Sequence, residues 1–238
     1  MLRDALGVSV SVERLGWIAR RFELVIFDCD GVLVDSEPII NRAHAEVLTA
    51  CGYPITEKVL VERFCGMSDP DMLEIIEREW CRALPASYAQ HVGLMIEAGF
   101  HQLAPIEGVA EALASLTLPI CVASSSNLEQ IRQKLEITGL LGRFDEHLFS
   151  ATMVARGKPA PDLFLYAAQH LMTAPDRCLI IEDSPAGIDA ALAAGMTAIG
   201  FAGGSHCGPE HGVRLQRHGA ALVMDHMLEL ATTIAKLA

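Results

Sequence analysis

The stretch LVIFDCDGVLVDSEP, residues 24–38, changes character after its first four residues. Residues 24–27 form a continuous apolar run, which is typical of a strand buried on both faces of a sheet. The run ends at Asp28, and Gly31 then allows the chain to turn sharply. We therefore predict a buried strand that delivers Asp28 and Asp30 to the carboxyl end of a sheet.

Comparable apolar runs recur along the chain, and each is followed by enough residues for a helix. They span residues 118–123, 178–181, 197–201 and 221–224. Strands that alternate with helices predict an α/β fold with a Rossmann-like parallel sheet, covered by helices on both faces. Ligands of such sheets bind at the carboxyl ends of the strands.

Helical periodicity replaces this rhythm between residue 37 and residue 105. We expect a first helix capped by Ser36 and a second that starts at Ser68 with Asp71 as its capping-box partner. A third helix is expected over residues 87–102.

This pattern predicts two units in the chain. The α/β core comprises residues 1–36 and 106–238, and an inserted α-helical cap domain comprises residues 37–105. The stretch 63–71 links two of the expected cap helices, and we expect it to face Asp28 and to influence specificity.

The chain is acidic and rich in apolar residues. It has 238 residues, of which 51% are hydrophobic, and 18 Lys and Arg against 30 Asp and Glu give a formal net charge of −12. That charge disfavours nucleic acid as a partner. We find neither an apolar run of about 18 residues nor a signal-peptide pattern, so we expect no membrane association. Seven cysteines without a C-x-x-C pair indicate reduced thiols and a cytoplasmic location.

Asp28 and Asp30 are the first candidates for chemistry. Two residues apart in an extended segment, their carboxylates point to the same side. Carboxylates held this close repel each other unless a cation or a shared proton intervenes. Mg²⁺ prefers oxygen ligands, so we expect it as a cofactor here. An acidic strand end that simply faces solvent is the alternative interpretation of this motif alone.

Three further polar groups follow apolar runs. Ser124, Ser125 and Asn127 offer hydroxyl, amide and backbone N–H groups for phosphate oxygens, although such residues are also ordinary helix caps. Lys158 lies in the loop GKPAPD, residues 157–162, where Asp162 is expected to cap the next helix. Glu182 and Asp183 directly follow the apolar run 178–181 and suit a cation.

Together these segments resemble a known family. DCDGVLVDSEP, VASSSN, GKPAPD and IIEDSPAGIDAALAAGM resemble, in order and spacing, the four motifs of the haloacid dehalogenase (HAD) superfamily of phosphohydrolases. The inserted helical segment looks like the cap of the β-phosphoglucomutase-like subgroup, which includes 6-phosphogluconate phosphatases. The resemblance extends over about residues 22–230.

The resemblance implies a role for each candidate. Asp28 would be the nucleophile that forms an aspartyl-phosphate, and Asp30 the acid and base. The metal ligands would be Asp28, the Asp30 carbonyl and Asp183, with Glu182 as a neighbouring ligand. Ser124, Ser125, Asn127 and Lys158 would bind the phosphate of a small metabolite, most plausibly a sugar or polyol phosphate.

A sugar-phosphate mutase of the β-phosphoglucomutase type is the alternative. The mutases that the chain resembles use a cap histidine and a cap arginine, whereas this sequence places Ile40 and Asp69 at those positions. We therefore favour hydrolysis, and we interpret His44 as a helix residue rather than a substrate ligand. A phospho-receiver domain fits neither the length nor the order of the motifs, and a catalytically silent binding protein is a further alternative. The substrate and the oligomeric state stay open, with a monomer favoured.

Overall fold

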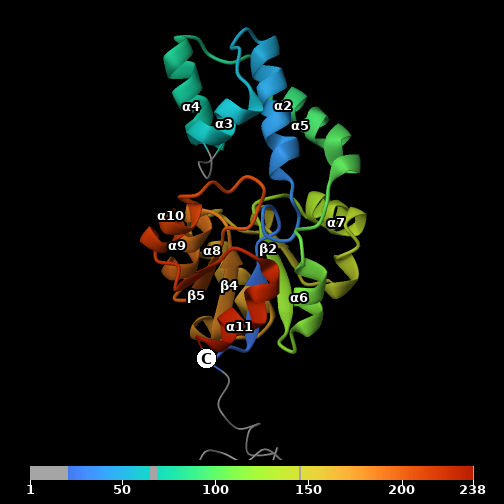
Figure 1. The fold of residues 1–238 in the computed structure, drawn as a ribbon, viewed down its shortest axis with the longest axis vertical. Helices are drawn as coiled ribbons and strands as arrows, with labels where there is room; N and C mark the ends of the chain where they lie inside the picture. The colour runs from blue at the N-terminus through green and yellow to red at the C-terminus, as the bar shows by residue number, and fades with distance from the viewer. Residues whose placement is uncertain (1–20, 65–68, 145, 238) are drawn as a thin grey trace, which may run out of the picture.

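The computed structural model describes residues 21–64, 69–144 and 146–237. Its centre is one sheet of six parallel strands in the order β3-β2-β1-β4-β5-β6 (Figure 1). The strands are β1 (Leu24–Phe27), β2 (Ile120–Ser124), β3 (Leu148–Ser150), β4 (Cys178–Glu182), β5 (Thr197–Phe201) and β6 (Leu222–Met224). The α/β fold class expected from the sequence is confirmed.

Six helices cover the two faces of the sheet because successive strand residues point to opposite sides. They are α6 (Val109–Ser115), α7 (Leu128–Ile137), α8 (Asp162–His170), α9 (Pro185–Ala193), α10 (His211–Arg217) and α11 (Leu230–Ala235). Val25 and Phe27 of β1 are buried in one hydrophobic cluster with residues of α6, α7 and α11. Leu24 and Ile26 are buried in a second cluster with residues of α8, α9 and α10.

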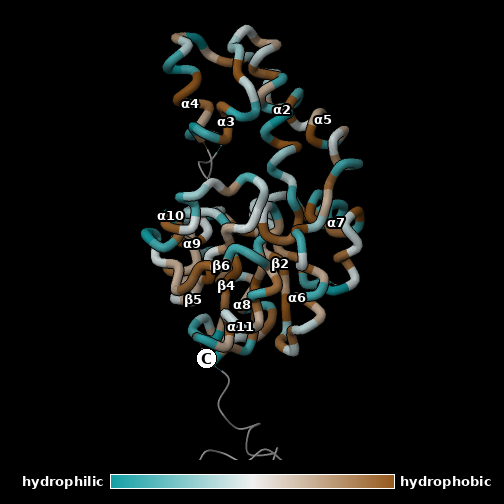
Figure 2. Tube along the Cα trace, in the orientation of Figure 1, coloured by the Kyte–Doolittle hydropathy of each residue, from teal (hydrophilic) through white to brown (hydrophobic). Residues whose placement is uncertain are grey.

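Four helices inserted between β1 and α6 form a separate group, which we call the helical module. It contains α2 (Glu37–Ala50), α3 (Glu57–Phe64), α4 (Asp69–Trp80) and α5 (Tyr88–Gly99), and a 3₁₀ turn, η1 (Phe100–Gln102), follows. These helices have their own hydrophobic cluster, which includes Leu48, Leu60, Ile76 and Val92. Figure 1 shows the module beyond the carboxyl ends of the strands, and Figure 2 shows hydrophobic and hydrophilic stretches alternating along its helices.

Two short segments connect the module to the sheet, and they lie side by side. Val34 and Pro105 form an antiparallel bridge. The Asp35 N–H donates to the Ala104 carbonyl, and the Ile106 N–H donates to the Leu33 carbonyl, both at 2.9 Å. The chain therefore leaves the core and re-enters it at one place.

Short 3₁₀ turns connect several core elements. They are η2 (Leu141–Arg143), η3 (Ala151–Met153), η4 (Pro175–Arg177) and η5 (Met227–Glu229). Among the described helices, none combines the length and the apolar character that crossing a membrane requires.

Candidate active site

The polar residues that follow β1, β2 and β4 lie around one cavity of about 450 Å³. The core contributes Asp28, Ser124, Glu182 and Asp183 from the strand ends and Lys158 from the loop before α8. Residues of α2, α3 and α4 line the same cavity from the side of the module. The structure thus brings together residues that are up to 155 positions apart in the chain, as the parallel strands predict.

Asp28 and Lys158 form the best-defined contact of this cavity. The Lys158 Nζ donates to Asp28 Oδ1 at 2.5 Å and to Glu182 Oε2 at 3.2 Å. The side chains of Lys158, Asp28 and Glu182 are 5%, 9% and 1% exposed. The ring of Phe164 lies 5.0 Å from Nζ and adds a cation–π contact. One buried ammonium therefore serves two buried carboxylates.

This burial changes the acidity of both carboxyl groups. Burial raises the pKa of Asp28 to about 6, since Lys158 offsets only part of the rise and Asp183 and Asp30 add to it. Burial likewise raises the pKa of Glu182 to about 8, and the Asp28 charge contributes. For Lys158, burial opposes the charge, but Asp28 and Glu182 outweigh it and the pKa is raised. The two carboxyl groups of Asp28 and Glu182 therefore favour a further positive charge nearby.

Asp30 has different partners from Asp28. Its Oδ1 accepts from Lys134 Nζ at 2.5 Å and from the Ser36 hydroxyl at 2.6 Å, and its Oδ2 accepts from the Ser126 hydroxyl at 2.9 Å. Burial acts to raise the pKa of Asp30, but the Lys134 charge and these hydrogen bonds outweigh it, so the pKa is lowered. Ser36 precedes α2 as expected, but its side chain makes no cap hydrogen bond and serves Asp30 instead.

Lys134 and Ser126 complete the surroundings of Asp30, and sequence reasoning missed both. Lys134 Nζ also donates to the Ser126 hydroxyl at 2.9 Å. A signal was present, because Lys134 lies between Ile131 and Leu135 on the buried face of α7. A lysine on the apolar face of an amphipathic helix requires a buried partner.

The segment after β2 places its residues unequally. Ser124 is buried, its hydroxyl accepts from the Ser126 N–H at 3.1 Å, and both Ser124 and Ser125 line the cavity. Asn127 instead forms a capping box with Gln130 at the start of α7 and is not among the cavity-lining residues. The structure gives Asn127 the helix-cap role, which was the other interpretation of this residue.

Asp183 is held by two histidines of the segment after β5. His206 Nε2 lies 2.9 Å from Asp183 Oδ2, and His211 Nε2 donates to the Asp183 carbonyl at 2.6 Å. Burial acts to lower the pKa of His206, but the Asp183 carboxylate outweighs it and raises this pKa to about 11. His206 therefore supplies a positive charge beside Asp183, which the sequence did not indicate.

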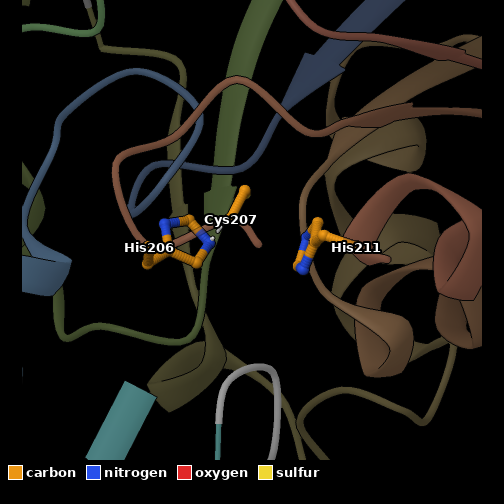
Figure 3. Close-up of side chains that lie close together, drawn as sticks. All are labelled: His206, Cys207 and His211. Carbon is orange, nitrogen blue, oxygen red and sulfur yellow. Dashed lines mark hydrogen bonds between the residues drawn. The ribbon is translucent and has the colours of Figure 1, made fainter. Parts of the chain in front are cut away.

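Figure 3 shows His206 and Cys207 on one loop, with His211 facing them. Their ligand atoms lie within 4.8 Å of one another, a spacing that also suits a metal. However, Arg214 Nη2 lies 3.0 Å from His211 Nδ1, so both ring nitrogens of His211 have hydrogen-bond partners. We therefore interpret His206 and His211 as residues that hold Asp183 in place through these contacts.

Asp28, Glu182 and Asp183 form the carboxylate group that suits Mg²⁺. One oxygen of each lies within 4.8 Å of the others. Carboxylate oxygens are ligands that Mg²⁺ prefers, and a bound cation would stabilise the ionised forms of Asp28 and Glu182, whose pKa values burial raises. The residues present therefore fit the expected metal. The Asp30 side chain is not part of this group and contacts Lys134 instead.

Two glycines allow the acidic residues to approach each other. Gly31 has a φ of +78°, and a Cβ there would collide with Asp183 and His206. A Cβ on Gly187, in the first turn of α9, would overlap the Glu182 carboxylate. The small residue after each acidic motif is thus required by the close packing of the site.

The module lines the cavity with both polar and apolar side chains. Glu37, Asn41 and His44 of α2 and Asp69 of α4 are the polar ones. His44, which we interpret from the sequence as a helix residue rather than a substrate ligand, lies in α2, is 4% exposed and lines the cavity. Ile40 also lines the cavity, as the alignment with the mutase histidine predicts.

Other expectations for the module and core had mixed outcomes. The helix expected to start at Ser68 begins in the structure at Asp69, and Ser68 lies outside the described residues. The expectation that Asp162 caps α8 is wrong, since Pro161 is the N-cap and Asp162 pairs with Arg156 at 2.7 Å. Phe64, Asp69 and Pro70 of the expected specificity stretch do line the cavity.

Sheet and cavity together define an α/β protein with a Rossmann-like parallel sheet and a cluster of polar residues at the carboxyl ends of its strands. The chain belongs to the haloacid dehalogenase-like hydrolase family, whose model matches residues 22–195. This confirms the resemblance found in the motifs. The match and the phosphatase names of several relatives support the expected enzyme class, the phosphoric monoester hydrolases.

Three curated relatives show the range of this family. A 6-phosphogluconate phosphatase of Escherichia coli is 31% identical over 191 residues, 79% of this chain and 86% of the relative. Hexitol phosphatase A of the same organism is 30% identical, over 73% of this chain and 80% of its own. A β-phosphoglucomutase of Bacillus subtilis is 32% identical, over 76% of this chain and 83% of its own.

Two solved structures are similar in fold and sequence. A haloacid dehalogenase-like protein of unknown function from Agrobacterium tumefaciens has a TM-score of 0.85 and 40% identity, over 91% of this chain and 99% of that one. A HAD family hydrolase from Deinococcus radiodurans, with bound phosphate and sodium, has a TM-score of 0.77 and 34% identity, over 91% of this chain and 96% of that one.

Proposed function

We propose that the protein is a Mg²⁺-dependent phosphatase that hydrolyses small sugar or polyol phosphates through an aspartyl-phosphate. The observation that carries this proposal is the buried pair of Asp28 and Lys158, which opens onto the same cavity as Ser124 and Asp183. The names of the E. coli relatives and the phosphate bound in the D. radiodurans structure support the substrate class.

Asp28 is the nucleophile of this proposal. One of its carboxylate oxygens attacks phosphorus, and the bond between phosphorus and the leaving oxygen breaks. Asp30 supplies the proton that the leaving oxygen needs, and later takes a proton from the water that cleaves the aspartyl-phosphate. That water returns Asp28 to its carboxylate form and releases inorganic phosphate.

Ser124, Ser125 and Lys158 position the transferring phosphoryl group. Lys158 lies next to Asp28, so its charge meets the phosphate oxygens at the attacking atom. We propose Asp28, Asp183 and the Asp30 carbonyl as metal ligands, with Glu182 nearby. When bound, Mg²⁺ would supply charge stabilisation for the phosphoryl oxygens.

The helical module acts as the cap domain in this proposal, with the boundaries 37–105 against a core of 1–36 and 106–238. The module lines the cavity opposite the phosphoryl group and so contacts the rest of the substrate. We propose a monomer in the cytoplasm with a small phosphorylated metabolite as its partner and no nucleic acid.

Hydrolysis is favoured over the mutase reaction by two cavity-lining residues. Ile40 and Asp69 take the positions of the mutase histidine and arginine, and both line the cavity. The aliphatic side chain of Ile40 has no proton to transfer, and the carboxylate of Asp69 repels a second phosphate group. Water is then the acceptor that the site accommodates.

The test is phosphate release from a panel of phosphorylated metabolites, with glucose 1-phosphate isomers included. We expect phosphate release that requires Mg²⁺ and stops with EDTA. Isomerisation of glucose 1-phosphate without phosphate release would support the mutase instead, and no reaction with any compound would overturn both readings. A rise in melting temperature with Mg²⁺ that Asp183→Asn removes would test the metal site separately.

A further inference from the structure

We infer that the leaving group of the substrate is an uncharged, hydroxyl-rich chain, and that Glu37, Asn41, His44 and Asp69 of the module select it over a leaving group that carries a carboxylate or a second phosphate. This inference rests on the proposed phosphatase function and specifies its substrate class.

The positive charges of the cavity lie on the core side, against carboxylates. Lys158 contacts Asp28 and Glu182, and Lys134 contacts Asp30. Each of these cations therefore already neutralises a core carboxylate, and the phosphoryl group and the metal occupy the same end of the cavity. None of them lies on the module.

The charged groups on the module side are acidic. Glu37 and Asp69 line the cavity there, and no lysine or arginine of the described module does so. Arg42 pairs with Glu57 at 3.2 Å, and Arg63 pairs with Glu79 at 2.7 Å, so both are engaged elsewhere. Residues 65–68, which the structure does not describe, are Cys-Gly-Met-Ser and add no cation. A second anionic group on the substrate would therefore meet like charge.

The same side chains suit hydroxyl groups. The His44 Nδ1 lies 2.7 Å from the Tyr88 hydroxyl, which fixes the imidazole. The His44 Nε2 is buried, has no hydrogen-bond partner among the described residues and lies 3.5 Å from Asp69 Oδ2. A buried polar atom at a cavity wall costs free energy until a ligand satisfies it. A substrate hydroxyl can donate to one of these groups and accept from another, and the Asn41 amide offers both functions.

The decisive experiment compares compounds that differ only at the end remote from the phosphate. Sorbitol 6-phosphate ends in a hydroxymethyl group, and 6-phosphogluconate ends in a carboxylate. We expect kcat/KM for sorbitol 6-phosphate to exceed that for 6-phosphogluconate by about tenfold or more, which corresponds to about 1.4 kcal/mol, because the remote carboxylate would meet the like charges of Glu37 and Asp69. Fructose 1,6-bisphosphate should be a poorer substrate still.

Burial raises the pKa of Glu37 to about 7. The assays are therefore run at pH 8, where most of this carboxyl group is ionised. Glu37→Gln and Asp69→Asn keep shape but remove charge, and each should reduce the preference by about threefold or more. The control is Glu62→Gln, since Glu62 is 60% exposed, pairs with Lys58 and does not line the cavity. It removes the same charge from the module and should leave the preference unchanged.

The outcomes separate the two claims. Equal or better hydrolysis of 6-phosphogluconate would overturn the inference while the phosphatase function stands. A preference that all three variants reduce equally would also overturn it, because the cause would then be the overall charge. Failure to hydrolyse either compound or any other phosphate monoester would overturn the proposed function itself.

Discussion

Lys134 determines the state of Asp30 in this structure. A carboxylate that accepts three hydrogen bonds and whose pKa is lowered is suited to take a proton from water. It is poorly suited to give a proton to a leaving oxygen. In the proposed reaction, Asp30 must therefore lose some of these contacts before the first step, and regain them for the second.

Lys134→Met should destabilise the fold. It leaves the Asp30 carboxylate without its charged partner, and breaking a buried ion pair costs about 3 kcal/mol. Because the folded pKa of Asp30 lies below its unfolded value, this stabilisation exists above pH 4 and is lost as the pH falls through the folded pKa. Urea denaturation from pH 3 to 7 measures the difference.

The partner variant Asp30→Asn provides the control. If the pair is the cause, the double variant with Lys134→Met should be less destabilised than the sum of the two single changes. Additive losses would contradict this account of Lys134.

Asp28→Asn should reduce the kcat of phosphate release by about a thousandfold or more, because an amide cannot serve as the nucleophile. The amide oxygen still accepts from Lys158 Nζ, so circular dichroism and the melting temperature should report an intact fold. Retained turnover in a folded variant would place the nucleophile elsewhere.

At the scale of elements, continuous apolar runs were the reliable signal. The expected bounds of β1 and β5 agree with the structure, and β2, β4 and β6 differ by at most two residues at either end. The sequence did not reveal β3, because three residues, Leu148–Ser150, carry too short a pattern. It also missed α3, whose eight residues have only Leu60 and Phe64 buried.

The candidate site was predictable to the same extent as the strands that carry it. Asp28, Ser124 and Asp183 follow directly from strand ends. Lys134 and His206 reach the site from a helix and a long loop, so their contacts depend on packing that no local pattern specifies. Asn127 had two local interpretations, and the capping box shows which one the backbone uses.

Gly187→Ala tests the packing of α9 against β4. A Cβ at this position would overlap the Glu182 carboxylate, so either α9 or Glu182 must move. We expect a loss of about 2 kcal/mol in the free energy of unfolding, together with lower activity, because overpacking forces such shifts. Chemical denaturation and phosphate release measure the two effects.

Gly93→Ala in α5 is the matched control, since nothing lies within 4 Å of a Cβ there. In the middle of a helix this change should be neutral or stabilising by about 0.5–1 kcal/mol. Equal losses for the two variants would show that the Glu182 contact is not the cause.

At the scale of the whole molecule, two adjacent segments join the helical module to the sheet along the described part of the chain. The module has its own hydrophobic cluster, so it can move as a unit about residues 31–36 and 103–108. With Mg²⁺, substrate and a phosphate mimic, we expect a smaller radius of gyration by small-angle X-ray scattering than with Mg²⁺ alone. Identical scattering in both conditions would count against this movement.

The bridge between Val34 and Pro105 has one more consequence. Both ends of the inserted segment lie next to each other at one point of the core, so the segment is a single insertion with adjacent ends. A chimera that grafts a foreign module between these two residues would leave every strand pairing and the Asp28–Lys158 contact in place. If the proposed function holds, selectivity and reactivity are encoded in two separate segments of the chain, which can be exchanged independently.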